Sequence, residues 1–198
     1  MWHHISLQKI WTEHLYRTTH VPDIANCEII KLPTYCIDNE LDQHILAELH
    51  QTIDYVSSHM ANYNLDDAVR SAITFVDVLS NRYVRRSRRR FWASGLEGDK
   101  LSAYHTLYEV ITTYLKLLAP IIPFNTEYLW QQIKPYEKNW NQTSIHLTSY
   151  PQASSIYINQ TLLEDIVQVR KIISMTLYLR AKNKLKIKQP LRTLEIKI

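Results

Sequence analysis

The chain has 198 residues, of which 45% are hydrophobic and 21% are charged, a composition that excludes a disordered or fibrous protein. Only two residues are glycine, which argues against a glycine-rich phosphate loop or a dinucleotide-binding motif. No apolar run approaches the roughly 18 residues of a membrane span. Cys27 and Cys36 match no metal-site spacing and no disulfide framework, so we expect no metal partner and a reducing, cytoplasmic setting. Since no apolar run is long enough, we also expect no membrane partner.

Positive charge is concentrated in two stretches. Six arginines fall between Arg82 and Arg90, and residues 170–198 hold nine basic residues against one acidic residue. Residues 1–169 as a whole hold 14 basic and 18 acidic residues. Concentrated cations on an otherwise acidic chain predict a polyanionic partner. The alternative is a solvated basic face that nearby carboxylates neutralise.

The first predicted helices follow an N-terminal segment, residues 1–40, that we interpret as partly irregular. From Leu41 to Met60, apolar residues recur at steps of three and four, which predicts an amphipathic α-helix. Asn64 is a candidate N-cap for a second helix. That helix is expected to continue through the arginines to about Trp92.

Three more helices are expected, over about 99–118, 125–134 and 160–183. The last residues, Lys184–Ile198, instead alternate basic or polar side chains with leucine or isoleucine, which is typical of short strands. The sequence thus predicts a mainly α protein with a β-like C-terminal tail.

Two units follow from this pattern. We expect an antiparallel helix bundle over residues 41–155, and a long helix with a basic, strand-like tail over residues 156–198. The tail would be the beginning of a second, truncated unit.

The arginine stretch from Asn81 to Trp92 is the most informative part of the chain. At about 100° per residue, Arg86 and Arg90 continue the apolar stripe of the helix that precedes them. A buried guanidinium needs an anionic partner, so we expect these two to form structural ion pairs. The candidate partners are Asp77, Glu109 and Glu127.

The remaining arginines suit a contact with RNA or with an adjoining domain. A guanidinium binds a phosphate through two parallel hydrogen bonds and also stacks on bases. We interpret Phe91 as a core residue, whereas Trp92 either closes the core or stacks on an unpaired base. The candidate RNA-binding residues are Arg82, Arg85, Arg88, Arg89, Trp92, Lys182, Lys184, Lys186 and Lys188.

Five segments together resemble the anticodon-binding region of the class I aminoacyl-tRNA synthetases, most closely that of the isoleucine enzymes. They occur in the family's order and cover the chain from about residue 40 to residue 198. His44 and Arg82 depart from the family's pattern, because each stands where a tryptophan is usual. The matching segments are Leu41–Leu49, Asn81–Trp92, Leu118–Phe124 with Glu127, Leu129 and Trp130 after it, Ser144–Leu147 with Tyr150 and Pro151 after it, and Lys186–Leu191.

The resemblance implies a tRNA-binding fragment of an enzyme that attaches isoleucine to its tRNA with ATP. The family's two catalytic signatures, His-Ile-Gly-His and Lys-Met-Ser-Lys-Ser, are absent from this sequence. We therefore expect no catalytic residue and no cofactor within the chain, with ATP serving only the intact enzyme. The implied partners are isoleucine tRNA and the parent chain's catalytic and editing domains. The alternative function is a helical module that docks the catalytic domain and has no direct RNA role.

Overall fold

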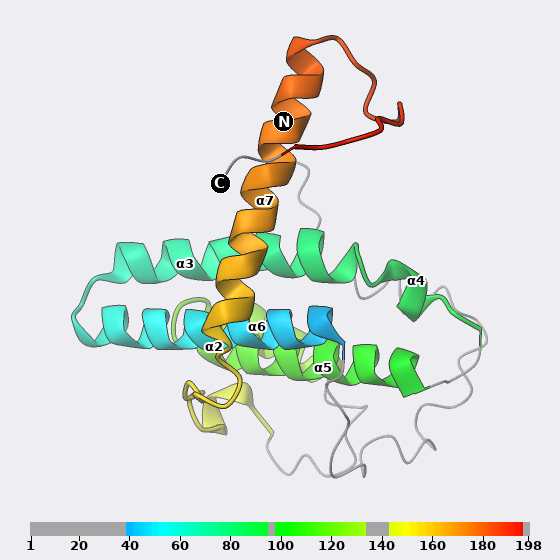
Figure 1. Ribbon diagram of the computed structural model, residues 1–198. Coiled ribbons are helices and arrows are strands. Elements are labelled where there is room, and N and C mark those ends of the chain that lie inside the picture. Colours follow the sequence, from blue (N-terminus) through cyan, green and yellow to red (C-terminus); the bar gives the residue numbers. More distant parts are fainter. Residues whose placement is uncertain (1–38, 95–97, 134–142, 196–198) are drawn as a thin grey trace. The chain divides into compact units, whose positions relative to one another are not determined.

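The computed structural model describes residues 39–94, 98–133 and 143–195, which divide into two compact units between Ile158 and Asn159. The expected N-terminal segment, residues 1–40, lies outside the described residues except for its last two. As expected, the described chain is mainly helical (Figure 1). Its elements are α2 (Glu40–Ala61), α3 (Leu65–Asp77), the π-helix η3 (Val78–Val84), α4 (Arg88–Phe91), α5 (Gly98–Leu118), α6 (Pro123–Ile133), the 3₁₀ helix η5 (Ile145–Leu147) and α7 (Gln160–Lys182).

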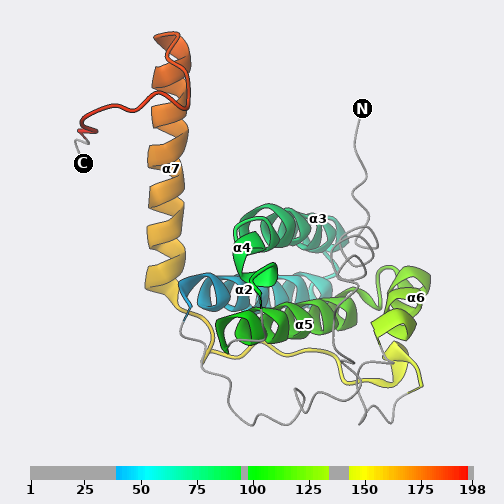
Figure 2. The same cartoon turned by 90° about the vertical axis from the view of Figure 1, so that its right-hand side faces the viewer.

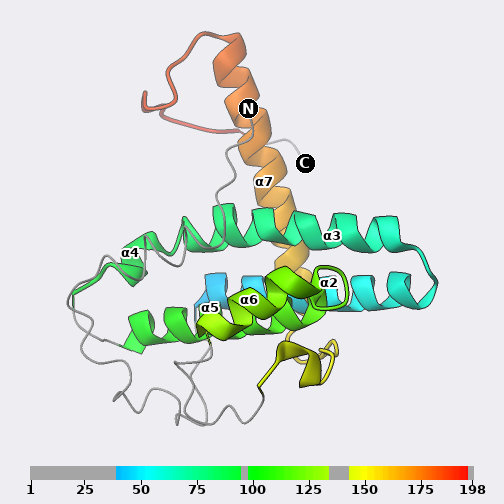
Figure 3. The same cartoon turned by 180° about the vertical axis from the view of Figure 1, so that it is seen from behind.

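The first unit is built on the hairpin of α2 and α3. Figure 1 shows α3 running back beside α2, and Figures 2 and 3 show α5 against α2 and α6 beside α5. Apolar side chains from all four helices are buried together between them. The largest of these fully buried side chains include Ile45, Leu49, Ile53, Phe75, Leu115 and Trp130.

The two ends of α2 are capped by side-chain and backbone hydrogen bonds. At the start, the N–H of Leu41 donates to Oδ1 of Asn39 over 2.9 Å, as an N-cap requires. At the end, the N–H groups of Tyr63 and Asn64 donate to the carbonyls of Met60 and His59. This is the Schellman pattern, and it places Tyr63 at φ 58°, where glycine is usual.

The π-helix η3 changes the register of the arginine stretch. Its wider turn is closed by the N–H of Arg85, which donates to the carbonyl of Ser80 five residues earlier, over 3.1 Å. As a result, Tyr83, Ser87 and Phe91 are the buried residues that follow. Arg86 is exposed. Its predicted place on the apolar stripe was wrong, because that prediction assumed an unbroken α-helix.

The second unit consists of α7 and the residues after it. The side chain of Asn159 caps α7 by accepting from the N–H of Leu162 over 3.1 Å. After Lys182, the described residues up to Glu195 form turns, bends and irregular backbone, and none of them is a strand. The expected β-like tail is therefore not confirmed. Two short strands bury too little surface to be stable alone. The carbonyl oxygens of Lys186 and Ile187 in this tail accept hydrogen bonds from Arg180 of α7 instead of from a neighbouring strand.

Candidate nucleic-acid interface

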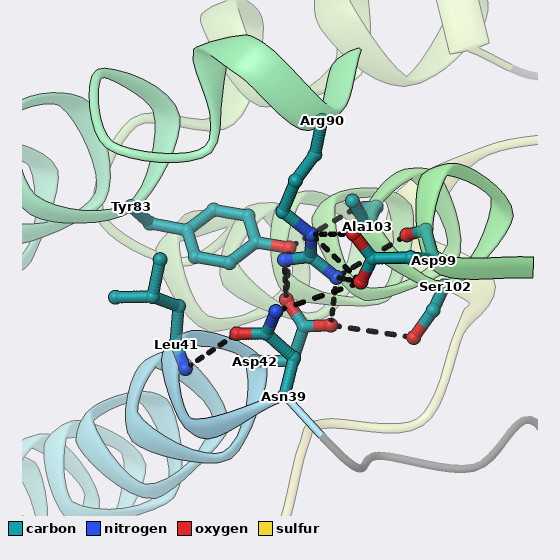
Figure 4. Close-up of polar contacts among 8 residues, drawn as sticks. All are labelled: Asn39, Leu41, Asp42, Tyr83, Arg90, Asp99, Ser102 and Ala103. Atoms are coloured by element: carbon teal, nitrogen blue, oxygen red, sulfur yellow. Dashed lines mark hydrogen bonds and ion pairs between the residues drawn. The ribbon is translucent and has the colours of Figure 1, made fainter. Parts of the chain in front are cut away.

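Arg90 lies at the centre of a partly buried ionic network that joins three helices (Figure 4). Its two terminal nitrogens donate to the two carboxylate oxygens of Asp42 in α2, each over 2.7 Å. Its Nε donates to both oxygens of Asp99 in α5, at 3.0 and 2.9 Å. Since Asp42 is completely buried, this bidentate pair supplies the partner that its charge requires.

Two hydroxyl groups complete the surroundings of Asp42. The hydroxyl oxygen of Tyr83 lies 2.7 Å from Oδ1 of Asp42 and 3.1 Å from the carbonyl oxygen of Ala103. The hydroxyl of Ser102 donates to the other carboxylate oxygen over 3.3 Å. Burial, and then the nearby Asp42, raises the pKa of Tyr83, so the phenol keeps its proton as a donor.

The carboxylates that meet the buried guanidinium differ from the predicted ones. Asp42 and Asp99 bind Arg90. The hydrogen bond from Arg90 holds the pKa of Asp99 below its usual value, against the opposing effect of burial, and the charge of Arg90 adds to the lowering. The predicted candidates included Asp77, which accepts from Asn81, and Glu127, which accepts from Gln131, Ser144 and the N–H of Ile145.

Arg82 is only partly available for a nucleic-acid contact. Its Nη1 lies 3.3 Å from Oε1 of Glu48 in α2, and its side chain is 22% exposed. Nε2 of His44 lies 3.2 Å from the same carboxylate oxygen. The predicted RNA contact at Arg82 would have to compete with this ion pair.

The other arginines of the stretch lie on the surface. Arg85, Arg86, Arg88 and Arg89 are exposed, and no ion pair within the described part of the chain involves Arg86. The guanidinium carbon of Arg88 lies 4.1 Å from the centroid of the Trp92 ring, which is a cation–π contact. Trp92 itself is 48% exposed, so its ring is not closed into the core.

The basic tail offers a second cationic surface. Lys182, Lys184, Lys186 and Lys188 are all exposed. The sequence contains no acidic residue between Asp165 and Glu195, so these charges have no neutralising neighbour along the chain. Within the described ranges, no cluster of histidine, cysteine and acidic side chains suits a metal ion. None of the described helices is both long enough and apolar enough to cross a membrane.

Comparison with known proteins assigns the chain to a class. Residues 42–197 match the family described as the anticodon-binding domain of tRNA ligase. The chain therefore belongs to this family of tRNA-ligase domains.

The curated relatives with significant similarity to the chain include isoleucine–tRNA ligases. The chain is 39% identical over 153 residues to the isoleucine–tRNA ligase of Chlamydia caviae, and 43% identical over 157 residues to that of Dehalococcoides mccartyi. These matches cover 77% and 79% of this chain. They cover only 14% and 16% of the two relatives, so the chain spans a small part of the length of such a ligase.

Proposed function

We propose that this chain is the part of an isoleucine–tRNA ligase that docks the anticodon arm of isoleucine tRNA. The proposal rests above all on the guanidinium of Arg88 against the half-exposed ring of Trp92, in a stretch where Arg85 and Arg89 are also exposed. In the parent enzyme, which would use ATP to attach isoleucine in the cytoplasm, the adenylating and editing domains are separate partners. The chain itself carries no catalytic role in this proposal.

The mechanism follows from the two kinds of side chain. Guanidinium and ammonium groups neutralise phosphates and fix the register of the RNA without reading its sequence. A base that is unpaired in the anticodon loop can stack on an aromatic ring such as Trp92. Arg88 already covers the Trp92 ring at 4.1 Å, so a stacking base would compete with this contact. Further phosphates of the RNA would be bound by four lysines of the second unit, Lys182, Lys184, Lys186 and Lys188.

The alternative function is a helical module that docks the catalytic domain without touching RNA. Exposed apolar side chains of the first unit favour it, since Phe124 is 89% exposed and Leu147 is 67% exposed. Such docking would be driven by apolar burial rather than by phosphate neutralisation, so it would respond differently to salt.

The test is tRNA binding across a salt series, measured by fluorescence anisotropy with isoleucine tRNA and with an anticodon-swapped copy. We expect the combined substitution R85Q/R88Q/R89Q to weaken binding and to reduce the salt slope by about 0.7 for each phosphate that the variant no longer neutralises. Arg70→Gln is the control, because Arg70 is also exposed but pairs with Asp66 on α3. An unchanged slope in the triple variant would favour the docking module. Stronger binding of the cognate anticodon would show that this chain reads it.

A further inference from the structure

The chain after α7 is folded back onto the end of that helix by one side chain. Nη1 of Arg180 donates to the carbonyl oxygens of Lys186, Ile187 and Gln189, at 3.0, 3.1 and 2.9 Å. A terminal guanidinium nitrogen carries two protons, so the three acceptors share them. A single guanidinium therefore closes a loop that spans nine positions of the chain.

Backbone hydrogen bonds give the same loop its shape. The N–H groups of Lys184 and Leu185 donate to the carbonyls of Ala181 and Arg180, which is a Schellman ending of α7. Lys184 takes the left-handed conformation at φ 54° that this ending needs. Further along, the N–H of Gln189 donates to the carbonyl of Lys186 over 3.0 Å and forms a tight turn.

The closed loop opposes the electrostatics of its own sequence. Lys182, Lys184, Lys186 and Lys188 alternate with uncharged residues, and a chain of like charges repels itself and extends. Arg180 adds one more positive charge, but its guanidinium donates to carbonyl oxygens, whereas the four lysines are exposed. A polyanion would relieve the repulsion without disturbing the hydrogen bonds to the carbonyls. Closure of the loop and anion binding therefore favour each other.

We propose that Arg180 is a positioning residue, which gathers Lys184, Lys186 and Lys188 into one loop that binds consecutive phosphates of an RNA backbone. In this scheme Nη1 of Arg180 is engaged by three carbonyl oxygens, and the residue acts by holding the loop closed. The inference rests on the proposed tRNA-binding function. It adds to that function a surface on the second unit whose geometry is set by a residue outside the lysine series.

Three variants of the whole chain separate positioning from charge. Arg180→Gln removes one charge and the hydrogen bonds to the carbonyls. Arg180→Lys keeps the charge but replaces the planar group with a single ammonium. Arg170→Gln removes one charge from an exposed position on the same helix and is the matched control. The probes are isoleucine tRNA in a salt series and amide hydrogen exchange at Gln189.

We expect both Arg180 variants to neutralise at least two fewer phosphates, so that the salt slope falls by about 1.4 or more, and the control to neutralise at most one fewer. Exchange at Gln189 should accelerate in both Arg180 variants and not in the control. Equal effects of R180Q and R170Q, or wild-type binding by R180K, would overturn the positioning role while leaving tRNA binding intact. Salt-independent or absent binding by the unaltered chain would instead overturn the proposed function, and this inference with it.

Discussion

Arg90 and Asp42 lie 48 positions apart in the chain and form a bidentate ion pair, with both bonds at 2.7 Å. The pair is almost closed to solvent, since the side chain of Arg90 is 11% exposed and that of Asp42 is 0% exposed. It fixes the end of the arginine stretch to the first turn of α2. In the same stretch Arg85, Arg86, Arg88 and Arg89 are exposed, whereas Arg90 is held inside.

Loss of Arg90 should destabilise the first unit strongly. Arg90→Leu leaves the charge of Asp42 buried without its partner, which costs about 3–5 kcal/mol of unfolding free energy. Arg70→Leu breaks the pair between Arg70 and Asp66, whose side chains are 73% and 72% exposed, and should change the unfolding free energy far less, because solvent screens an exposed ion pair. Urea unfolding of both variants checks this. The double variant D42L/R90L should regain part of the stability, and similar costs for the two single variants would contradict the assignment.

Tyr63 should be improved by glycine. A non-glycine residue in the left-handed region costs about 1–2 kcal/mol, and Tyr63 at φ 58° is 90% exposed, so removal of its ring sacrifices little packing. After the extra chain entropy of glycine is subtracted, Tyr63→Gly should raise stability by roughly 0.5–1 kcal/mol. Tyr55→Gly inside α2 should lower it, because that backbone is helical. Thermal unfolding of the two variants should therefore shift in opposite directions.

His50 should make the first unit less stable in mild acid. Burial lowers the pKa of His50 from its usual value of 6.5, and the nearby charge of Glu109 offsets only part of this effect. Its Nδ1 accepts from the N–H of Ser154 over 3.2 Å, and its ring stacks on Tyr157 at 4.7 Å. Below pH 6.5 the unfolded chain binds a proton at His50 more readily than the folded chain does. The free energy of unfolding therefore decreases as the pH is lowered from 6.5, until the pH falls below the pKa of His50 in the folded chain.

The check on His50 is urea unfolding of the wild type and of His50→Asn between about pH 5 and pH 8. Asparagine retains an acceptor near Ser154 but does not titrate in this range. We expect the difference in unfolding free energy between the two proteins to change with pH below 6.5 and to be constant above it. A difference that is constant over the whole range would show that His50 is not the group responsible.

Trp92 should contribute to RNA affinity through its ring. If one unpaired base stacks on it, Trp92→Ala should weaken binding of an anticodon stem-loop by about 1–3 kcal/mol, and Trp92→Phe should retain part of that. Phe124→Ala is the control, since Phe124 is an exposed aromatic residue of α6, outside the arginine stretch. If Trp92→Ala and Phe124→Ala both weakened binding only slightly and by the same amount, Trp92 would not be part of the RNA-binding site.

The sequence predicted the helices better than it predicted the interactions among them. Apolar spacing located α2, α5 and α7, because a 3.6-residue period leaves a direct trace in the sequence. The register of the arginines was missed, since a π-helix is decided by packing and not by local preference. The buried partner of Arg90 was missed as well. Asp42 resembles an ordinary acidic residue in the first turn of a helix.

The tail shows a different reason for failure. Alternating lysine and apolar residues predict a strand, but a strand also needs a neighbour to accept its backbone hydrogen bonds. Here the carbonyls of Lys186 and Ile187 accept from Arg180 instead. No residue in the alternating pattern signals that interaction, because the donor belongs to the preceding helix. The tRNA-binding role predicted for the lysines remains a prediction.

The short helix α4 has only four residues, Arg88–Phe91, and a helix of that length has too few hydrogen bonds to persist by itself. The side chain of Arg90 fixes the orientation of α4 by its ion pairs with Asp42 in α2 and Asp99 in α5. Substitutions in the first turn of α2, far from any arginine in the sequence, should then behave in a genetic screen like substitutions in the proposed RNA-binding surface. Natural variants there would be mistaken for RNA-binding residues unless their folding were measured separately.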